Sequence, residues 1–537
     1  MMDIVITNGL LVDGKGTPAI RADVGITGDT VTAIGDLEGV VSGVTIDAAG
    51  KVVSPGFIDM HTHSDFAMLL DGHAENMIRR GVTTEVTGNC GIGAAPVSPE
   101  HRGLLLEFLT AMIDRNSGLV DLSGESFGDY LSNLSVCEMT TNIAPLAAQG
   151  AIRIAEMGFS ADKADAAQTA SMREMVALAM RDGALGISSG LIYLPGIYTS
   201  TEELTAVTAG VKEYGGCYVT HMRSEGDLIF EAIDEAVAIA AGAGVPLHIS
   251  HLKLSSASVR GQAERLFARL ERAEEEGLEV SFDAYPYESG ETSLSALLPS
   301  WVCEGGMAKG LERLGDKSLR KDMVRDMTLG IRGWQNLLQD SGGFAGVTVA
   351  LMNNSANKEF EGKSLAEIAD IRSADPFETL FDLLISEGGG GGIIIKLMDE
   401  DDVDAIIAHP KTMIGSDGLS LPASALKEGC FLHPRYFGTH AKILRKYVRE
   451  KKLLTLEDAI RKMTLAPARR LKLHRRGTIE VGNYADVIVF DKDTVRDNAT
   501  YGEAKYSTGI EKVIINGKLV LDDDKHTETF PGRVVGR

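Results

Sequence analysis

Near its N-terminus the chain reads Phe57-Ile58-Asp59-Met60-His61-Thr62-His63, an apolar run that ends in two histidines separated by one residue. Residues i and i+2 of a β-strand point to the same side, so both imidazoles can reach a single metal ion. A His-x-His pair is common by chance, and alone it would carry little weight. The pair becomes informative only when the rest of the chain is placed around it.

The middle of the chain alternates short apolar stretches with helical ones, such as Asp227–Gly242 and Gly261–Glu276. Strand–helix alternation predicts a parallel sheet, and eight such strands predict a closed (β/α)8 barrel of the TIM type. We therefore expect an α/β fold of this class. The expected strands are Val52–Met60, Val82–Gly88, Thr141–Leu146, Ala184–Ser189, Cys217–His221, Pro246–His251, Glu279–Tyr285 and Thr412–Asp417.

Residues that can bind a metal gather at the C-terminal ends of these strands. In such a barrel these ends converge on one mouth, where active sites lie. A thiolate, several imidazoles and a carboxylate form a donor set that suits zinc. Any one of these residues alone would more often be a packed core residue, so the argument rests on their common placement. The candidate metal ligands are His61, His63, Cys90, His221, His251 and Asp417.

Both ends of the chain read as short β-strands outside the barrel. Apolar and polar residues alternate there in short bursts between Gly, Asn and Asp, which is typical of small antiparallel sheets. We expect residues 1–54 and 471–537 to pair into one small discontinuous β-sandwich, and residues 55–470 to form the barrel. The chain after the seventh strand is longer than a barrel loop requires, and we expect an inserted lid at about 290–350.

Composition and charge narrow the function classes. The formal net charge of −23 gives an acidic surface that repels phosphate backbones, which disfavours nucleic-acid binding. Five cysteines in 537 residues are no disulfide framework and suit a reducing compartment. There is no signal-peptide pattern and no apolar run of about 18 residues, so no membrane partner is expected. We expect a cytoplasmic protein that acts on a small molecule, and the sequence leaves a homo-oligomer open.

Several motifs are shared with one known family. They are residues 53–63 (VSPGFIDMHTH), 87–91 (TGNCG), 220–223 (THMR), 248–251 (HISH), 285–287 (YPY), 413–418 (MIGSDG) and 477–487, which leads back to the terminal strands. With these motifs the chain resembles the amidohydrolase superfamily over nearly its whole length, and within it the N-acyl-D-amino-acid deacylase (D-aminoacylase) family. Related hydantoinases and dihydroorotases generally use a carboxylated Lys of strand four, and residues 185–190 contain none.

The resemblance implies a metal-dependent hydrolase of non-peptide carbon–nitrogen bonds, and specifically zinc-dependent deacylation of N-acyl-D-amino acids. It implies that Asp417 takes a proton from the attacking water and passes it to the leaving amine. The implied ligands are Cys90, His221 and His251 for one tightly bound zinc, and His61, His63, Cys90 and Asp417 for a second, weaker ion.

The resemblance also assigns residues to the substrate. Lys253, Tyr285 and Arg435 match residues that bind the substrate α-carboxylate. Tyr193, in the loop after strand four, either donates to the developing oxyanion or forms an aromatic wall. Glu291 stands where the family usually has a Ser that contacts the carboxylate, and two facing carboxylates repel. We expect Glu291 at the pocket mouth, kept ionised by Lys253 and Arg435; a surface Glu on a mobile lid is the alternative.

Two further departures from the family concern the substrate. Ala148-Gln149-Gly150 stands where Gly-His-Gly is usual, and the segment between Asp417 and Arg435 is longer than usual. Two other functions stay open. One is an amidohydrolase acting on a cyclic amide or dipeptide, like a hydantoinase or dihydroorotase. The other is a non-catalytic barrel scaffold, which the complete ligand set argues against.

Overall fold

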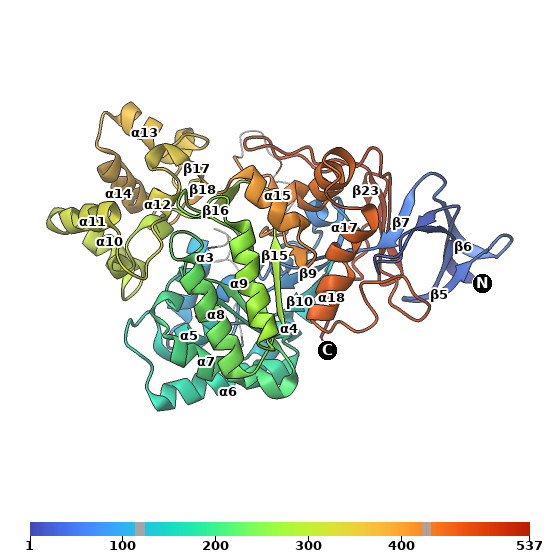
Figure 1. The fold of residues 1–537 in the computed structure, drawn as a ribbon, viewed down its shortest axis with the longest axis horizontal. Coiled ribbons are helices and arrows are strands. Elements are labelled where there is room, and N and C mark those ends of the chain that lie inside the picture. Colours follow the sequence, from blue (N-terminus) through green and yellow to red (C-terminus); the bar gives the residue numbers. More distant parts are fainter. Residues whose placement is uncertain (113–123, 422–425, 427–430, 537) are drawn as a thin grey trace.

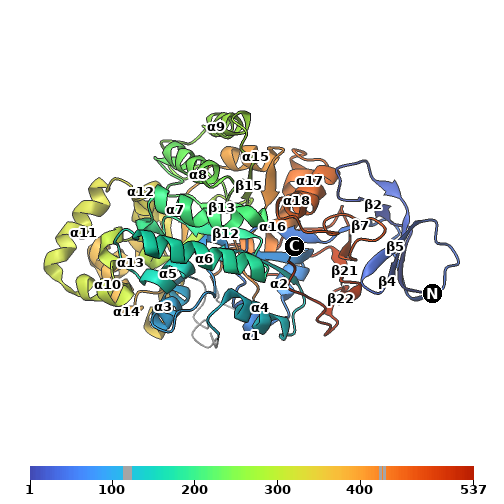
Figure 2. The ribbon, with the colours of Figure 1, turned by 90° about the horizontal axis from the view of Figure 1, so that it is seen from below.

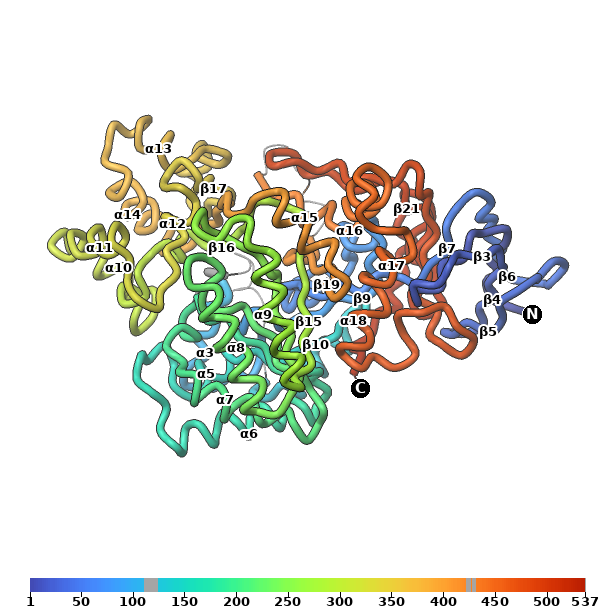
Figure 3. Tube along the Cα trace, viewed as in Figure 1, coloured from blue at the N-terminus to red at the C-terminus, as the bar shows by residue number. Residues whose placement is uncertain are grey.

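The structure is a computed structural model that describes residues 1–112, 124–421, 426 and 431–536. A central region of helices and strands lies between a helical lobe, yellow in Figure 1, and the blue N-terminal strands. The turned view in Figure 2 keeps this lobe and these strands at opposite ends, and the tube in Figure 3 follows the chain between them. None of the helices in the described residues combines the length and hydrophobicity needed to cross a membrane.

The central region is built on a closed ring of parallel strands. Two sheets, ordered β10-β9-β8 and β11-β12-β13-β14-β15-β19, make up the ring, and β10 runs on into β11. Backbone hydrogen bonds from Leu185 to Pro145 and from Met60 to Ile414 join the two sheets at both ends. The strands are β8 (Phe57–Asp59), β9 (Val82–Thr87), β10 (Asn142–Pro145), β11 (Ala147–Ala148), β12 (Gly186–Gly190), β13 (Cys217–His221), β14 (Leu247–Ile249), β15 (Val280–Ala284) and β19 (Thr412–Ile414).

Helices surround this ring. Their ends follow the usual rules: Asp165 accepts a hydrogen bond from the Gln168 backbone N–H at the start of α6, and Gly183, at φ 127°, ends it. The helices around the ring are α1 (Ala67–Leu70), α2 (Glu75–Ile78), α3 (Arg102–Met112), α4 (Phe127–Ser135), α5 (Gln149–Met157), α6 (Ala166–Asp182), α7 (Thr201–Thr208), α8 (Ile229–Ala243), α9 (Ala263–Glu275), α15 (Glu400–Ala408), α16 (Arg435–Lys442), α17 (Leu456–Met463) and α18 (Leu465–Arg470).

Two further sheets are built from the chain ends. The four-stranded sheet β5-β4-β1-β6 uses the N-terminal residues, and the seven-stranded sheet β23-β22-β21-β20-β7-β2-β3 combines both ends. Both sheets contribute to one hydrophobic core, which contains Ile4 and Val24 from the first and Val53 and Ile514 from the second. Their strands are β1 (Met2–Thr7), β2 (Leu10–Leu11), β3 (Ile20–Arg21), β4 (Asp23–Thr27), β5 (Thr30–Gly35), β6 (Ser42–Asp47), β7 (Val52–Pro55), β20 (Val487–Phe490), β21 (Ile510–Ile515), β22 (Lys518–Asp522) and β23 (Lys525–His526).

The expectation of one strand over Val52–Met60 is wrong, because the chain divides there into β7 and β8. Strand β7 pairs with β20 and β2 of the seven-stranded sheet, whereas β8 pairs with β9 of the ring. The division falls at Gly56, where an added Cβ would lie 2.2 Å from the Thr83 side chain. The close approach that only glycine permits therefore lets the chain pass from one sheet to the other.

The yellow lobe of Figure 1 is inserted between β15 and β19. It contains a three-stranded antiparallel sheet in the order β16-β18-β17, and β18 returns to pair with β16 along its whole length. The sheet therefore extends from Ser289 to Lys396. Its elements are β16 (Ser289–Ser293), α10 (Met307–Gly315), α11 (Lys317–Leu329), α12 (Leu337–Asp340), β17 (Val347–Leu351), α13 (Leu365–Arg372), α14 (Pro376–Ser386) and β18 (Gly392–Lys396).

A buried ion pair joins the first and last strands of the ring. The Arg80 guanidinium donates to the Asp59 carboxylate at 3.0 Å and to the Ser416 hydroxyl at 3.1 Å, and neither charged side chain is exposed to solvent. The other Asp59 oxygen accepts from the Ser416 N–H at 2.8 Å. Arg80 also donates to the carbonyl of Arg435 at 2.6 Å. One buried cation thus fixes three segments that lie far apart in the sequence.

Arg80→Met is expected to lower the free energy of unfolding by about 3–5 kcal/mol, because it leaves the Asp59 carboxylate buried without its partner. The urea midpoint, followed by circular dichroism, measures the effect. Arg272→Met is the matched control: its ion pair with Glu276 is mostly exposed, and its loss should change the stability by only about 0.5 kcal/mol. Equal midpoints for the two variants would contradict a structural role for the buried pair.

Candidate functional site

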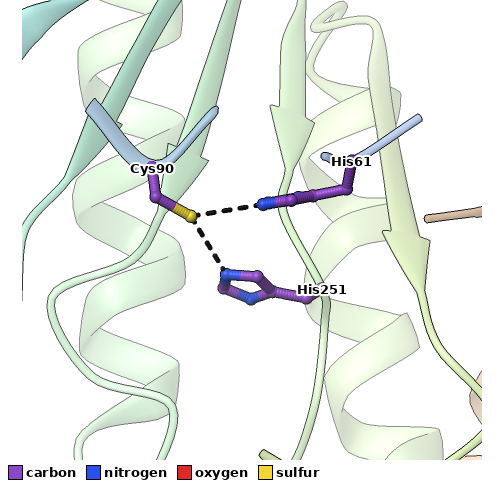
Figure 4. Close-up of side chains that lie close together, drawn as sticks. All are labelled: His61, Cys90 and His251. Carbon is purple, nitrogen blue, oxygen red and sulfur yellow. Dashed lines mark hydrogen bonds between the residues drawn. The ribbon is translucent and has the colours of Figure 1, made fainter. Parts of the chain in front are cut away.

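Four candidate ligands meet at the thiol of Cys90. Its Sγ lies 3.3 Å from His61 Nε2, 3.4 Å from His251 Nε2 and 3.7 Å from His221 Nδ1. Figure 4 shows the rings of His61 and His251 directed at the sulfur from two sides. The histidines come from the ends of β8, β13 and β14, so the ring of strands brings together residues that are far apart in the sequence.

A tight turn after β9 directs Cys90 into the ring. Gly88, Cys90 and Gly91 all have positive φ values, of 78°, 54° and 70°. A Cβ at Gly88 would lie 2.2 Å from the Leu146 carbonyl oxygen, so only glycine fits there. The Gly-Asn-Cys-Gly stretch therefore has a steric reason as well as a chemical one.

The other two candidate ligands lie beside this cluster. His63 Nε2 is 3.0 Å and His61 Nε2 is 3.5 Å from the same oxygen of Asp417. The second Asp417 oxygen accepts a 2.8 Å hydrogen bond from Arg435. His61 therefore belongs to two groups at once, one with Cys90 and one with Asp417, and the six candidate ligands form one continuous cluster.

Neighbouring charged groups in the cluster shift one another's pKa values. Burial alone would raise the pKa of the Cys90 thiol, but the neighbouring His61 and His251 hold it well below its usual value. Burial alone would lower the pKa of His63, but its hydrogen bond to Asp417 and the nearby thiolate raise it to about 9. Burial would also raise the pKa of Asp417, yet Arg435 and His63 keep it well below its usual value. These residues therefore offer a thiolate and a carboxylate to a cation.

The donor set and its spacing fit a metal ion. Ligands bound tetrahedrally to zinc at about 2.0–2.3 Å lie about 3.5 Å from one another, and the distances from the Cys90 sulfur to the three imidazole nitrogens are close to this value. His221 Nε2 and His63 Nδ1 are buried without a hydrogen-bond partner. A cation bound here would take the place of the protons shared between thiol and imidazoles.

Two carboxylates that the sequence analysis did not identify form hydrogen bonds or ion pairs with the candidate ligands. Asp283, in β15, accepts from the His251 N–H at 3.0 Å and lies 3.5 Å from His61 Nδ1, and it also binds His248 at 2.8 Å. Glu225 lies 2.9 Å from His251 Nδ1. The sequence signals for these two roles are weak. Asp283 is a single acidic residue inside an apolar strand, and Glu225 comes four residues after His221.

The residues expected to bind the substrate carboxylate lie on one side of the cluster. Lys253 and Arg435 both face the ring of Tyr285, with their charged groups 5.6 Å from its centre. Lys253 donates to Glu225 at 2.7 Å, and Arg435 to Asp417. In the segment between Asp417 and Arg435, residues 422–425 and 427–430 lie outside the described part of the chain.

Glu291 lies beside Arg435 and not between two cations. Its carboxylate is 4.0 Å from Arg435 Nε, and its carbonyl accepts from Arg435 at 3.4 Å, whereas the Lys253 ammonium pairs with Glu225. Burial raises the pKa of Glu291 more than Arg435 lowers it. The expectation that Glu291 lies near both cations is therefore wrong for Lys253, whose ammonium pairs with Glu225, and Arg435 is the cation beside the Glu291 carboxylate.

Tyr193 lies between His221 and the first strand of the inserted lobe. Its ring packs edge-on against His221, with the ring centres 5.1 Å apart, and its hydroxyl accepts from Thr292 at 3.3 Å. Gln149, in the position of a family His, is buried and donates to Thr199 at 3.0 Å. Of the other histidines, His409 stacks on Phe267, and His433 packs edge-on against Tyr285 and accepts from the Arg435 backbone N–H at 3.0 Å.

Comparisons with known proteins agree over the whole chain. A model of the amidohydrolase family matches residues 44–521. Three proteins of Alcaligenes xylosoxydans xylosoxydans align over nearly the full length of both chains. A D-aminoacylase is 34% identical and covers 100% of this chain and 98% of its own, and an N-acyl-D-glutamate deacylase is 33% identical, with 100% and 97% covered. An N-acyl-D-aspartate deacylase is 31% identical, with 99% and 95% covered.

Solved structures extend the likeness. The crystal structure of a D-aminoacylase has a TM-score of 0.81 and 33% identity, with both chains fully covered. An N-acyl-D-glutamate deacylase from Bordetella bronchiseptica, complexed with zinc and a phosphonate mimic of the tetrahedral intermediate, has a TM-score of 0.82 and 30% identity over both full chains. A dihydropyrimidinase from Brevibacillus agri shares the fold alone. It is 17% identical, has a TM-score of 0.57, and the match covers 100% of this chain and 99% of the other.

Cys90→Ala is expected to lower the zinc content of the purified protein and its hydrolytic activity together, because the thiolate at the centre of the cluster is lost. Metal analysis by mass spectrometry after gel filtration measures the zinc. Cys137→Ala is the control, since that partly buried cysteine follows α4 and donates to the Asn133 carbonyl at 3.3 Å. Normal zinc content in Cys90→Ala would mean that Cys90 only fills space.

Proposed function

This chain belongs to the amidohydrolase family, and from that premise we propose that it hydrolyses the amide bond of N-acyl-D-amino acids, releasing a carboxylate and a free D-amino acid. The observation that carries the proposal is the contact of the Cys90 sulfur with three imidazoles beside Asp417. The full-length likeness to D-specific deacylases supports the choice of substrate class.

We assign the cofactor as zinc, in line with the zinc-bound relative. Cys90, His221 and His251 would hold a tightly bound ion. A second, weaker ion would be held by His61, His63, Cys90 and Asp417. Zinc bound here supplies a Lewis acid toward the scissile carbonyl and lowers the pKa of a bound water to about 7.

Asp417 is the proposed catalytic acid–base. His63 Nε2 and Arg435 hold its two oxygens, at 3.0 and 2.8 Å, which fixes the carboxylate plane at the mouth of the ring. Its lowered pKa keeps the carboxylate ionised. In this role an Asp417 oxygen receives the proton of the attacking water and delivers it to the leaving nitrogen.

Other side chains are proposed to position the substrate. Lys253, Tyr285 and Arg435 lie together and would face the α-carboxylate, and Tyr193 would approach the scissile carbonyl from the His221 side. Glu291, next to Arg435, would reduce the positive field that reaches a substrate carboxylate. The strength of this effect depends on its protonation, which burial favours.

We also propose a role for each part of the architecture. The shared core of the two terminal sheets supports a discontinuous β-sandwich made of residues 1–54 and 471–537, flanking a catalytic barrel of residues 55–470. The inserted lobe would act as a lid, and the pairing of β16 with β18 makes residues 289–396 a better unit than the expected 290–350. Its first strand, β16, contacts both Arg435 and Tyr193, so the lobe borders the cluster directly.

The zinc-loaded protein is expected to release D-alanine from N-acetyl-D-alanine and to leave the L-enantiomer intact. Asp417→Asn should keep the tightly bound zinc and lose about 10²–10⁴-fold in kcat, because an amide does not accept the proton. Chiral chromatography of the products measures the reaction. Hydrolysis of the L-substrate alone, or a kcat unchanged in Asp417→Asn, would contradict the proposal.

Glu291→Ser is expected to lower KM for N-acetyl-D-alanine about fivefold, which corresponds to about 1 kcal/mol of like-charge repulsion removed near Arg435. Steady-state kinetics with the free acid and with its neutral carboxamide measures the effect, and the carboxamide should gain less. Glu288→Ser is the matched control three residues earlier, on a half-exposed side chain. The same KM in the wild type and in Glu291→Ser, for both substrates, would contradict a role in substrate binding.

A further inference from the structure

One buried side chain of the inserted lobe reaches into the barrel. Gln335 lies just before α12 and is buried. Its amide oxygen accepts a hydrogen bond from the Glu225 backbone N–H at 3.0 Å, and its amide nitrogen donates to the Ser255 hydroxyl at 2.9 Å. The same nitrogen donates to the Asp340 carboxylate of α12 at 2.7 Å. Because the oxygen and both N–H groups of the amide have partners, its orientation is fixed.

The two barrel segments that Gln335 joins each follow a candidate metal ligand. Glu225 comes shortly after His221, the last residue of β13, and Ser255 comes shortly after His251, which follows β14. The Ser255 N–H donates to the Glu225 carbonyl at 2.8 Å, so the two segments also contact each other. Gln335 therefore completes a cycle of hydrogen bonds between the lobe and both ligand-bearing segments.

Glu225 connects this cycle with the candidate active site. One oxygen of its buried carboxylate accepts from Lys253 at 2.7 Å and lies 2.9 Å from His251 Nδ1. The other oxygen lies 3.7 Å from His221 Nε2. Carboxylates that hold metal-binding histidines typically contribute about 10–100-fold to metal affinity. A displacement of Glu225 would therefore disturb the proposed carboxylate site and two metal ligands together.

The lobe and the barrel approach each other closely at this contact. A Cβ at Gly226, the residue after Glu225, would lie 2.6 Å from an oxygen of Asp340, so no side chain fits there without a shift. A second glutamine of α12 behaves differently: Gln339 donates to the carbonyls of residues 327 and 328, which belong to the lobe itself. The two glutamines therefore separate a contact between lobe and barrel from a contact within the lobe.

We propose that Gln335 is a positioning residue, through which the inserted lobe holds Glu225 in place. Glu225 in turn fixes Lys253 toward the substrate and the two histidines toward the metal. The inference rests on the proposed function and adds to it, because the lobe then supports the metal ligands from within the barrel and does more than cover the site.

Gln335→Met keeps the length of the side chain and removes its hydrogen bonds. We expect zinc to bind about tenfold more weakly and KM for N-acetyl-D-alanine to rise about tenfold, because Glu225 loses its backbone partner. The value of kcat should change less than about threefold, since Asp417 is not part of this network. Competition with a chelator measures the zinc affinity, and steady-state kinetics of the zinc-loaded enzyme measures KM and kcat.

Gln339→Met is the matched control, since it makes the same substitution on the same segment and removes only contacts inside the lobe. Its zinc affinity and KM should equal those of the wild type. Ser255→Ala is a milder second variant that removes one partner of the Gln335 amide, and it should show about a threefold loss in zinc affinity. Zinc affinities of Gln335→Met and Ser255→Ala equal to that of Gln339→Met would overturn the inference.

A double-mutant cycle separates positioning from a general effect on the lobe. Glu225→Gln weakens zinc binding by itself, and if Gln335 acts through Glu225, the addition of Gln335→Met should cost less than about a further twofold. Losses that multiply independently would overturn the assignment. The zinc measurements need no substrate, so they decide the inference separately: an enzyme that cleaves no D-substrate would contradict the proposed function, while the zinc affinities of the variants would still support or overturn the role of Gln335.

Discussion

The buried ion pair between Asp59 and Arg80 is the contact on which the site depends. It lies where the first strand of the ring meets the last, and Asp59 binds the backbone N–H groups of both His61 and Ser416. The next residue after Ser416 is Asp417. Because Arg80 also holds the carbonyl of Arg435, one charge pair sets the positions of a candidate ligand on each strand and of the cation that binds Asp417. Without this contact, a ring of strands would still bring these residues to the same end, but it would not fix their positions relative to one another.

The candidate ligands are held in backbone conformations that cost energy. Cys90, His251 and Asp417 have φ values of 54°, 35° and 53°, in the left-handed region that non-glycine residues rarely adopt. Each costs about 1 kcal/mol or more, which surrounding hydrogen bonds offset. The His251 N–H donates to Asp283 and the Asp417 N–H to the His61 carbonyl. Strain of this kind persists where the neighbourhood determines the position of a side chain, as at a metal-ligand cluster.

Sequence patterns were sufficient for the parts of the fold that depend on local order. Apolar runs marked the strands of the ring, and the convergence of their ends placed His61, His221 and Asp417 together. Patterns were insufficient where partners are distant. The division at Gly56 depends on Thr83 in the neighbouring strand, and the extent of the inserted lobe depends on β18 returning to β16 after about a hundred residues. Asp283 and Glu225 carry no periodic signal. A single acidic residue beside a metal ligand looks the same in the sequence as one on the protein surface.

The junction of the first and last strands also bears on how the chain folds. Residues 59 and 416 are separated by more than three hundred residues of chain, so closing the ring costs loop-closure entropy. Contacts between residues so far apart in the sequence form slowly during folding. The adjacent parallel strands can pair one after another before that step. His61 and Asp417 meet only when the ring closes, whereas Cys90, His221 and His251 come at the ends of β9, β13 and β14, which are linked through β10 and β12 without that closure. We therefore expect the two halves of the cluster to form at different times, with the Asp417 half last.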